Sequence, residues 1–141
     1  MATSYETIYN RFATKIQDFD LANLSDADLE ETLRGYLSTA VSNFRRCQND
    51  LSDRDDELRR FNADLLDVEQ EILATLMARA WLQPQIQSTL LTAQVFSDKE
   101  QKFYAQQSHM STLIDLDEKL KVDAQKLSRD YTYMNASYWE G

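Results

Sequence analysis

The stretch from residue 67 to residue 91 constrains the fold most, because it has the densest apolar pattern of the chain and contains its single proline. Apolar residues recur there as adjacent pairs every four residues, which at 3.6 residues per turn places a broad apolar face along one side of a helix. We therefore predict a central core helix on which the other helices pack. Its apolar positions are Ile72, Leu73, Leu76, Met77, Ala80 and Trp81.

Both ends of this helix carry local signals. Asp67 can cap the first turn and Gln70 can bond back to the cap, while Glu69 places negative charge at the positive end of the helix dipole. Pro84 lacks an N–H group and its ring crowds the preceding turn, so it ends or kinks the helix. We expect the chain to change direction after Leu82 and the apolar pattern to continue on a second short segment.

The chain has only two glycines and one proline, so the turn chemistry that β-hairpins need is nearly absent. This scarcity predicts an all-α fold. A chain of 141 residues suits one domain, and such a domain buries about two-thirds of the surface that its unfolded chain exposes. We expect residues 1–141 to form a single helical bundle of four to five helices.

Apolar residues spaced by three and four positions predict three further helices. The first spans about residues 4–16, the second opens at a capping signature on Ser25 and runs to about residue 48, and a long last helix spans about residues 98–130. Gly35, inside the second helix, costs about 1 kcal/mol relative to alanine. It is either a tolerated surface glycine or the mark of a close approach by another helix.

The connection over residues 49–60 is the most charged run of the chain. Only Leu51 and Leu58 can anchor it, so it is interpreted as an exposed loop or a frayed helix. Its aspartates lack the glycine turn and the downstream glutamate of an EF-hand calcium loop, and we interpret them as solvated acids.

Large amphipathic or apolar side chains gather after the last predicted helix. Tyr and Trp bury large area at low entropic cost, so we predict that residues 131–141 form a docking tail that binds another chain. Trp81 is a further docking candidate, either as an anchor in a neighbour's pocket or as a core residue with a partner for its indole N–H. The tail residues predicted to dock are Tyr131, Tyr133, Met134, Tyr138 and Trp139.

Charge and cysteine content exclude several classes of function. The net charge of −9 argues against the basic patch with which proteins bind nucleic-acid phosphates. A lone cysteine, Cys47, cannot form an internal disulfide, and no leader follows Met1, which indicates synthesis in a reducing cytoplasm. No apolar run approaches the roughly 20 residues that a bilayer span needs, so no membrane contact is expected.

No group of residues suggests catalysis or a cofactor. His109 is the single histidine and lies among polar residues, which favours a solvated side chain over a metal ligand. Cys47 has Arg45 and Arg46 beside it but no histidine partner, which favours a small filler residue over a nucleophile. We predict no catalytic residue, no metal, no cofactor and no enzymatic activity.

Apolar positions and short blocks follow one order along most of the chain: Tyr5, Ile8, Phe12 and Ile16, then Asp18-Phe19-Asp20, Ala40-Val41, Phe44, Phe61, Leu65, Glu71-Ile72-Leu73-Ala74, Met77, Trp81-Leu82-Gln83-Pro84, Phe103-Tyr104 and Tyr131. In this order of helices and apolar positions, the chain resembles the small helical head-to-tail adaptor, or connector, proteins of tailed bacteriophages. The long last helix and the aromatic end depart from the family pattern.

The resemblance implies a virion protein that forms a ring of typically twelve copies beneath the portal. Such a ring continues the DNA channel and offers a platform to the next neck or tail protein. Acids on the channel wall would repel the passing phosphates and avoid tight binding of DNA. The candidates for that wall are Asp53, Asp55, Asp56 and Glu57. The alternative is a cytoplasmic, acidic helical chaperone or binding module that masks an assembly partner.

Overall fold

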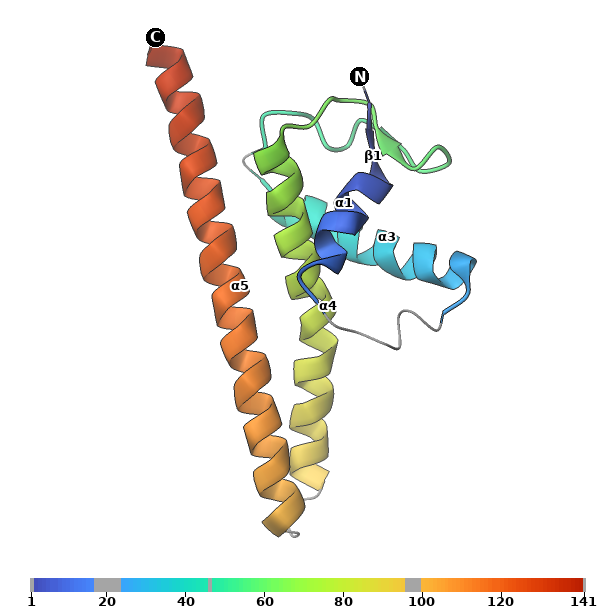
Figure 1. The fold of residues 1–141 in the computed structure, drawn as a ribbon, viewed down its shortest axis with the longest axis vertical. Helices are drawn as coiled ribbons and strands as arrows, with labels where there is room; N and C mark the ends of the chain where they lie inside the picture. The colour runs from blue at the N-terminus through green and yellow to red at the C-terminus, as the bar shows by residue number, and fades with distance from the viewer. Residues whose placement is uncertain (1, 17–23, 46, 96–99, 141) are drawn as a thin grey trace.

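The computed structural model describes residues 2–16, 24–45, 47–95 and 100–140, and the side chains of these residues except 89–110 and 133–140. It is 70% helical, with four helices and a small three-stranded sheet in the described part of the chain (Figure 1). The predicted all-α fold is confirmed.

Helix α4 (Asp67–Val95) is the centre of the fold. Helices α1 (Tyr5–Ala13), α3 (Asp26–Asn43) and α5 (Glu100–Glu140) all pack on it. Figure 1 shows α5 beside α4 on one side and α1 and α3 on the other. All seven side chains from residue 72 to residue 78 are buried, as expected for a helix enclosed by partners on every side.

Helix α4 passes through Pro84 and continues to Val95, so the predicted end after Leu82 is wrong. Pro84 itself is exposed, and water can therefore hydrate the carbonyl group that loses its partner. Leu82 is fully buried before the proline, and Ile86 packs against the core after it. This packing outweighs the roughly 3 kcal/mol by which a proline disfavours a helix interior.

The first two helices agree with their predicted positions and are shorter at their C-terminal ends. Helix α1 begins after Ser4, whose hydroxyl accepts a hydrogen bond from the Glu6 N–H at 3.2 Å. Helix α3 begins after Ser25, whose hydroxyl accepts from the Asp28 N–H at 3.2 Å, which confirms the predicted cap. Both caps satisfy amide groups that a helix start leaves unpaired.

Helix α5 is longer than predicted. It has 41 residues, which corresponds to about 61 Å, and it continues past the predicted end near residue 130 to Glu140. Its inner face is buried and its outer face carries Ile114 and Val122, which are 48% and 49% exposed. The buried residues on the described part of that inner face are Leu113, Leu120, Ala124 and Tyr131.

The charged connection contains β-structure that the sequence analysis did not predict. Strands β1 (Thr3–Ser4), β2 (Arg54–Asp55) and β3 (Arg60–Phe61) form an antiparallel sheet in the order β1-β3-β2. The hairpin turns without glycine, because Arg59 adopts the left-handed φ of 54°. The connection is therefore mostly exposed, as predicted, but residues 54–61 form a hairpin in place of an irregular loop or frayed helix.

The two leucines of the connection differ in their surroundings. Leu51 is buried and anchors the hairpin to the core, as expected. Leu58 is 58% exposed at the turn, so its predicted role as an anchor is wrong.

Gly35 is a surface glycine. A Cβ atom added there would meet nothing within 4 Å, so the alternative of a close helix approach is wrong within this chain. The residue keeps its helical conformation only at the entropic cost of glycine.

We therefore expect Gly35→Ala to raise the free energy of unfolding by about 0.5 to 1 kcal/mol, because alanine restricts the unfolded chain and meets no clash in the folded one. Urea unfolding followed by circular dichroism measures this change. A loss of stability in this variant would contradict the open space around Gly35.

Candidate interaction surfaces

Tyr131, predicted to dock on another chain, belongs instead to the core of its own chain. Its side chain is 1% exposed, and its ring meets that of Phe44 edge to face at 5.6 Å between centroids. Its hydroxyl donates to Glu69 Oε2 and accepts from the Gln48 N–H, both at 2.8 Å. The reason is its spacing: position 131 follows Leu127 by four residues and so stays on the inner face of α5.

Trp81 is also a core residue. It is 6% exposed within its own chain, so the prediction that it anchors on a neighbour is wrong and the core alternative holds. It belongs to the same cluster of buried side chains as Leu82 and Phe12.

The remaining tail residues, Tyr133, Met134, Tyr138 and Trp139, have side chains outside the described part of the structure. Their backbone is helical and belongs to α5, so residues 131–140 are not a separate tail. Figure 1 shows this end of α5 projecting beyond the first turn of α4. The docking of these four residues stays a prediction, and we name residues 132–140 the α5 overhang.

Glu69 is the most heavily bonded side chain of the core, with an exposure of 0%. Its Oε1 accepts from the Leu66 N–H at 2.7 Å and from Asn49 Nδ2 at 2.8 Å, and its Oε2 accepts from the Tyr131 hydroxyl and from Cys47 Sγ at 3.1 Å. All four partners are donors, which suits an acceptor-only carboxylate. The bond to Leu66 is the back-bond of a capping box, a role predicted for Gln70.

The two titratable partners of Glu69 are strongly perturbed. Burial, followed by the hydrogen bond and the charge of Glu69, raises the pKa of Cys47 from 9.0 to about 12. Burial is also the largest cause that raises the pKa of Tyr131 to about 12; the Gln48 N–H lowers this pKa, and the hydrogen bond and charge of Glu69 raise it. Cys47 therefore stays a thiol at neutral pH, as expected for a filler residue rather than a nucleophile.

A second polar cluster fixes the start of α4 to α1. Arg11 donates to Glu71 Oε2 at 3.0 Å, Gln70 Oε1 at 3.2 Å and Asp67 Oδ1 at 3.2 Å, and Lys15 pairs with Glu71. Burial alone would raise the pKa of Glu71, but the hydrogen bonds from Lys15 and Arg11 outweigh it and lower that pKa. Asp67 thus binds Arg11, and the structure gives it no capping bond.

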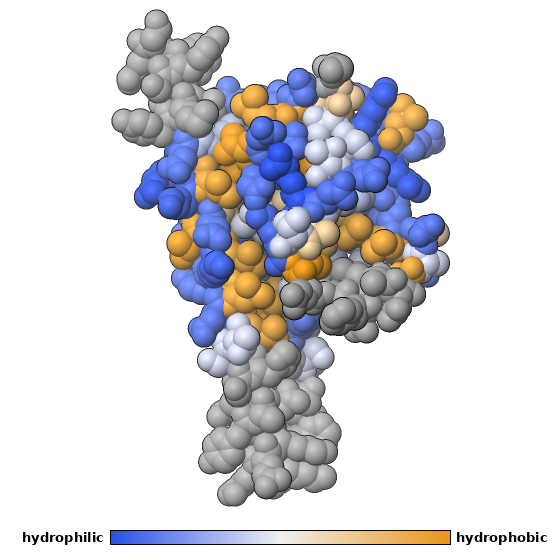
Figure 2. All heavy atoms as spheres, in the orientation of Figure 1, coloured by the Kyte–Doolittle hydropathy of each residue, from blue (hydrophilic) through white to orange (hydrophobic). Residues whose placement is uncertain are grey.

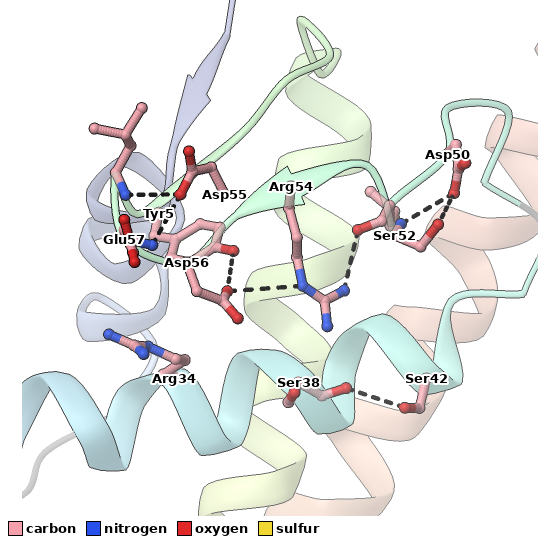
Figure 3. A network of polar contacts seen from close by, with 12 residues as sticks. Tyr5, Arg34, Ser38, Ser42, Asp50, Ser52, Arg54, Asp55, Asp56 and Glu57 are labelled. Atoms are coloured by element: carbon pink, nitrogen blue, oxygen red, sulfur yellow. Dashed lines mark hydrogen bonds and ion pairs between the residues drawn. The ribbon is translucent and has the colours of Figure 1, made fainter.

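Of the four acids predicted for a channel wall, Asp55, Asp56 and Glu57 lie in the hairpin (Figure 3), and Asp53 directly precedes its first strand. Asp53 accepts from Asn62 Nδ2 at 2.8 Å, and Asp56 accepts from the Tyr5 hydroxyl at 2.6 Å. Asp55 Oδ1 accepts from the backbone N–H groups of Glu57 at 2.9 Å and Leu58 at 3.1 Å. Three of the acids therefore hold the hairpin in shape. We name residues 55–58 the hairpin tip; Glu57 and Leu58 present exposed side chains there.

An open groove of about 740 Å³ runs between the end of α3 and the helices α4 and α5. Its apolar floor is formed by Phe44, Leu76 and Ala124. Its lining contains four cationic side chains and no carboxylate, although the whole chain carries a net charge of −9. We name it the basic groove, and its cations are Arg45, Arg79, Lys121 and Arg129.

A second groove, of about 490 Å³, lies between the end of α1 and α5. Figure 2 shows apolar surface on the seam beside α5, bordered by polar side chains. The lining mixes three lysines with three acids, so its charge favours no class of partner. The leucines in it are Leu116, Leu120 and Leu127.

The described residues hold no metal site. Within them, no three His, Cys, Asp or Glu side chains are placed to hold a metal ion, and no helix is long and apolar enough to cross a membrane. The side chain of His109 lies outside the described part. The hydrogen-bond network of Glu69 and the basic groove were not predicted from the sequence. A glutamate three residues after a helix start was a usable signal for Glu69, but nothing local connects the groove residues.

Tyr131→Phe is expected to lower the free energy of unfolding by about 1 to 3 kcal/mol, because it leaves the buried Glu69 carboxylate and the Gln48 N–H each without one partner. The matched control is Tyr9→Phe, which removes a longer bond of 3.4 Å to Glu30 and should cost less. Urea unfolding of both variants measures the difference. Equal losses would contradict the central role of the Glu69 network.

The stability should fall as the pH rises above about 9, because the unfolded chain then loses the Cys47 proton that the folded chain keeps up to about pH 12. Below pH 9 this contribution is complete. One proton corresponds to a slope of up to about 1.4 kcal/mol per pH unit. Between pH 8 and pH 10, the free energy of unfolding should fall less steeply with pH for Cys47→Ala than for the wild type. Identical slopes would exclude Cys47 as the source of the pH dependence.

Comparison of the chain with family models, with curated proteins and with solved structures found no match.

Proposed function

We propose that the protein is a structural component of a tailed-phage neck. In this proposal its copies form a ring beneath the portal, of about twelve by the family resemblance, which joins head to tail and continues the DNA channel. The observation that carries the proposal is the α5 overhang, an end of a long helix with no other described helix of the chain beside it.

The overhang follows from how α5 is fixed on α4. Tyr131 bonds to Glu69, the third residue of α4, so the nine residues that follow rise about 14 Å beyond Tyr131 and extend about 11 Å past the start of that helix. Met134 and Tyr138 follow Tyr131 at steps of three and four residues, which continues the apolar pattern of the inner face. A helix that continues its apolar pattern beyond its own partner suits a surface offered to another protein.

The shape of the molecule supports the same function. Figure 1 shows the α4 and α5 pair continuing well below the level of α1 and α3 as a two-helix arm. The outer face of α5 also exposes Ile114 and Val122, which a neighbouring subunit could cover. The overhang at one end of α5 and the two-helix arm at the other suit a protein that spans from the portal to the next neck or tail protein.

The acidic charge supports passage of DNA without tight binding. A ring of copies, each with a net charge of −9, repels phosphates and does not trap the genome as it moves. In this proposal the protein is synthesised in the host cytoplasm, has no enzymatic activity and resides in the virion.

Two truncations test the role of the overhang, since the structure separates it from Tyr131. A chain ending at residue 132 keeps Tyr131 and should retain the helical circular dichroism and nearly the melting temperature of the full chain. It should no longer bind the portal ring encoded in the same genome, as measured by mass photometry. A chain ending at residue 130 loses Tyr131 and should be less stable as well.

Two outcomes would contradict the proposal. One is full portal binding by the chain ending at residue 132. The other is the absence of the full-length protein from purified particles, which would favour the alternative of a cytoplasmic chaperone or binding module.

A further inference from the structure

We propose that the basic groove of one copy receives the hairpin tip of a second copy. This inference rests on the proposed ring and names the surfaces through which its copies meet. It is carried by the charge of the groove, the chemistry of the tip and the positions of both on the molecule.

The groove needs an acidic occupant with an apolar centre. Arg79 bonds to Asp117 Oδ1 at 3.2 Å and Arg129 lies 3.9 Å from Asp130, so these two cations are partly compensated within the chain. Among the described residues, Arg45 and Lys121 have no ion pair. The floor of the groove is apolar, and a cationic rim around an apolar floor favours a segment with one apolar side chain among carboxylates.

The hairpin tip has this composition. Leu58 is 58% exposed and follows three acids directly, Asp55, Asp56 and Glu57. Arg59 and Arg60 come next, and Arg59 Nε lies 3.5 Å from Glu30 Oε1. It is the most exposed of the large apolar side chains in the described part of the chain. Docking would bury Leu58 on the apolar floor and bring the exposed carboxylate of Glu57 to the cationic rim.

The tip is already ordered for docking. The two backbone bonds to Asp55 close the turn, the bond from Tyr5 to Asp56 ties it to α1, and β2 and β3 pair behind it (Figure 3). A partner that is rigid before binding loses little conformational entropy on docking. The hairpin can therefore act as a preformed projection.

The two surfaces face different neighbours. Figure 1 shows the hairpin and α5 on opposite sides of α4, so the tip of a copy cannot reach its own groove. A contact between two different surfaces is heterologous, and its repetition closes into a ring or continues as a filament. This contact places the hairpin acids between subunits and thereby replaces their predicted place on the channel wall.

Cysteine trapping tests the contact in the full-length chain. In a Cys47→Ser background, Leu58→Cys in one copy should form a mixed disulfide with Ser128→Cys, a groove residue, in another copy under mild oxidation at low salt. The matched control is Ser111→Cys, which lies on α5 outside the groove and is exposed. The groove pair should form at least about tenfold faster than the control pair, and added salt should slow it.

Charge reversal shows whether the groove cations cause this trapping. Lys121→Glu in the copy that supplies the groove should slow trapping about tenfold, and Glu57→Lys in the copy that supplies the tip should then restore the rate. Lys126→Glu, on α5 but in the second groove, should leave the rate unchanged. Equal rates for the groove and control pairs, or equal effects of Lys121→Glu and Lys126→Glu, would overturn the inference. Neither result bears on portal binding through the α5 overhang, so the proposed function can stand or fall separately.

Discussion

The buried carboxylate of Glu69 is the interaction on which the rest of the structure depends. An unpaired carboxylate in an apolar core costs several kcal/mol, and this one is satisfied only when the connection after α3, the start of α4 and α5 arrive together. Each donor comes from a different position of the chain. The network therefore selects one arrangement of these segments among the many that would bury similar apolar area.

The most direct consequence is the register of α5 on α4. Apolar faces of two helices tolerate a slide by one turn, about 5.4 Å, because leucine packs on leucine in either position. Polar bonds do not tolerate it. Tyr131 with Glu69 at one end, and Asp117 with Arg79 and Gln83 further along, fix the slide, and so they fix how much of α5 extends past α4. The length of the overhang is thus set inside the core.

Much of the fold could be predicted from periodicity, and the misses have definite physical causes. The first, second and central helices and the cap on Ser25 were predicted because they depend on residues close in sequence. The cap on Ser4 is equally local, but it was not predicted. The helix end predicted at Pro84 was wrong because it followed from a local rule, whereas packing against α5 keeps the helix continuous. The hairpin was missed because Arg59 takes a left-handed conformation that usually marks glycine. Tyr131 was assigned to a tail although its spacing from Leu127 already placed it on the inner face.

The candidate surfaces could be predicted from the sequence even less well than the fold. Arg45, Arg79, Lys121 and Arg129 come from three helices or their ends, so no single window of the sequence contains the groove, although residues 119–129 hold four cations and one acid. Only the packing of α3 and α5 on α4 brings them together. The net charge of −9 repels other copies of the chain and DNA at long range, whereas the cationic lining of the groove favours an acidic segment at that surface. In the proposed contact between copies, the groove supplies the local attraction that offsets the repulsion between two acidic subunits.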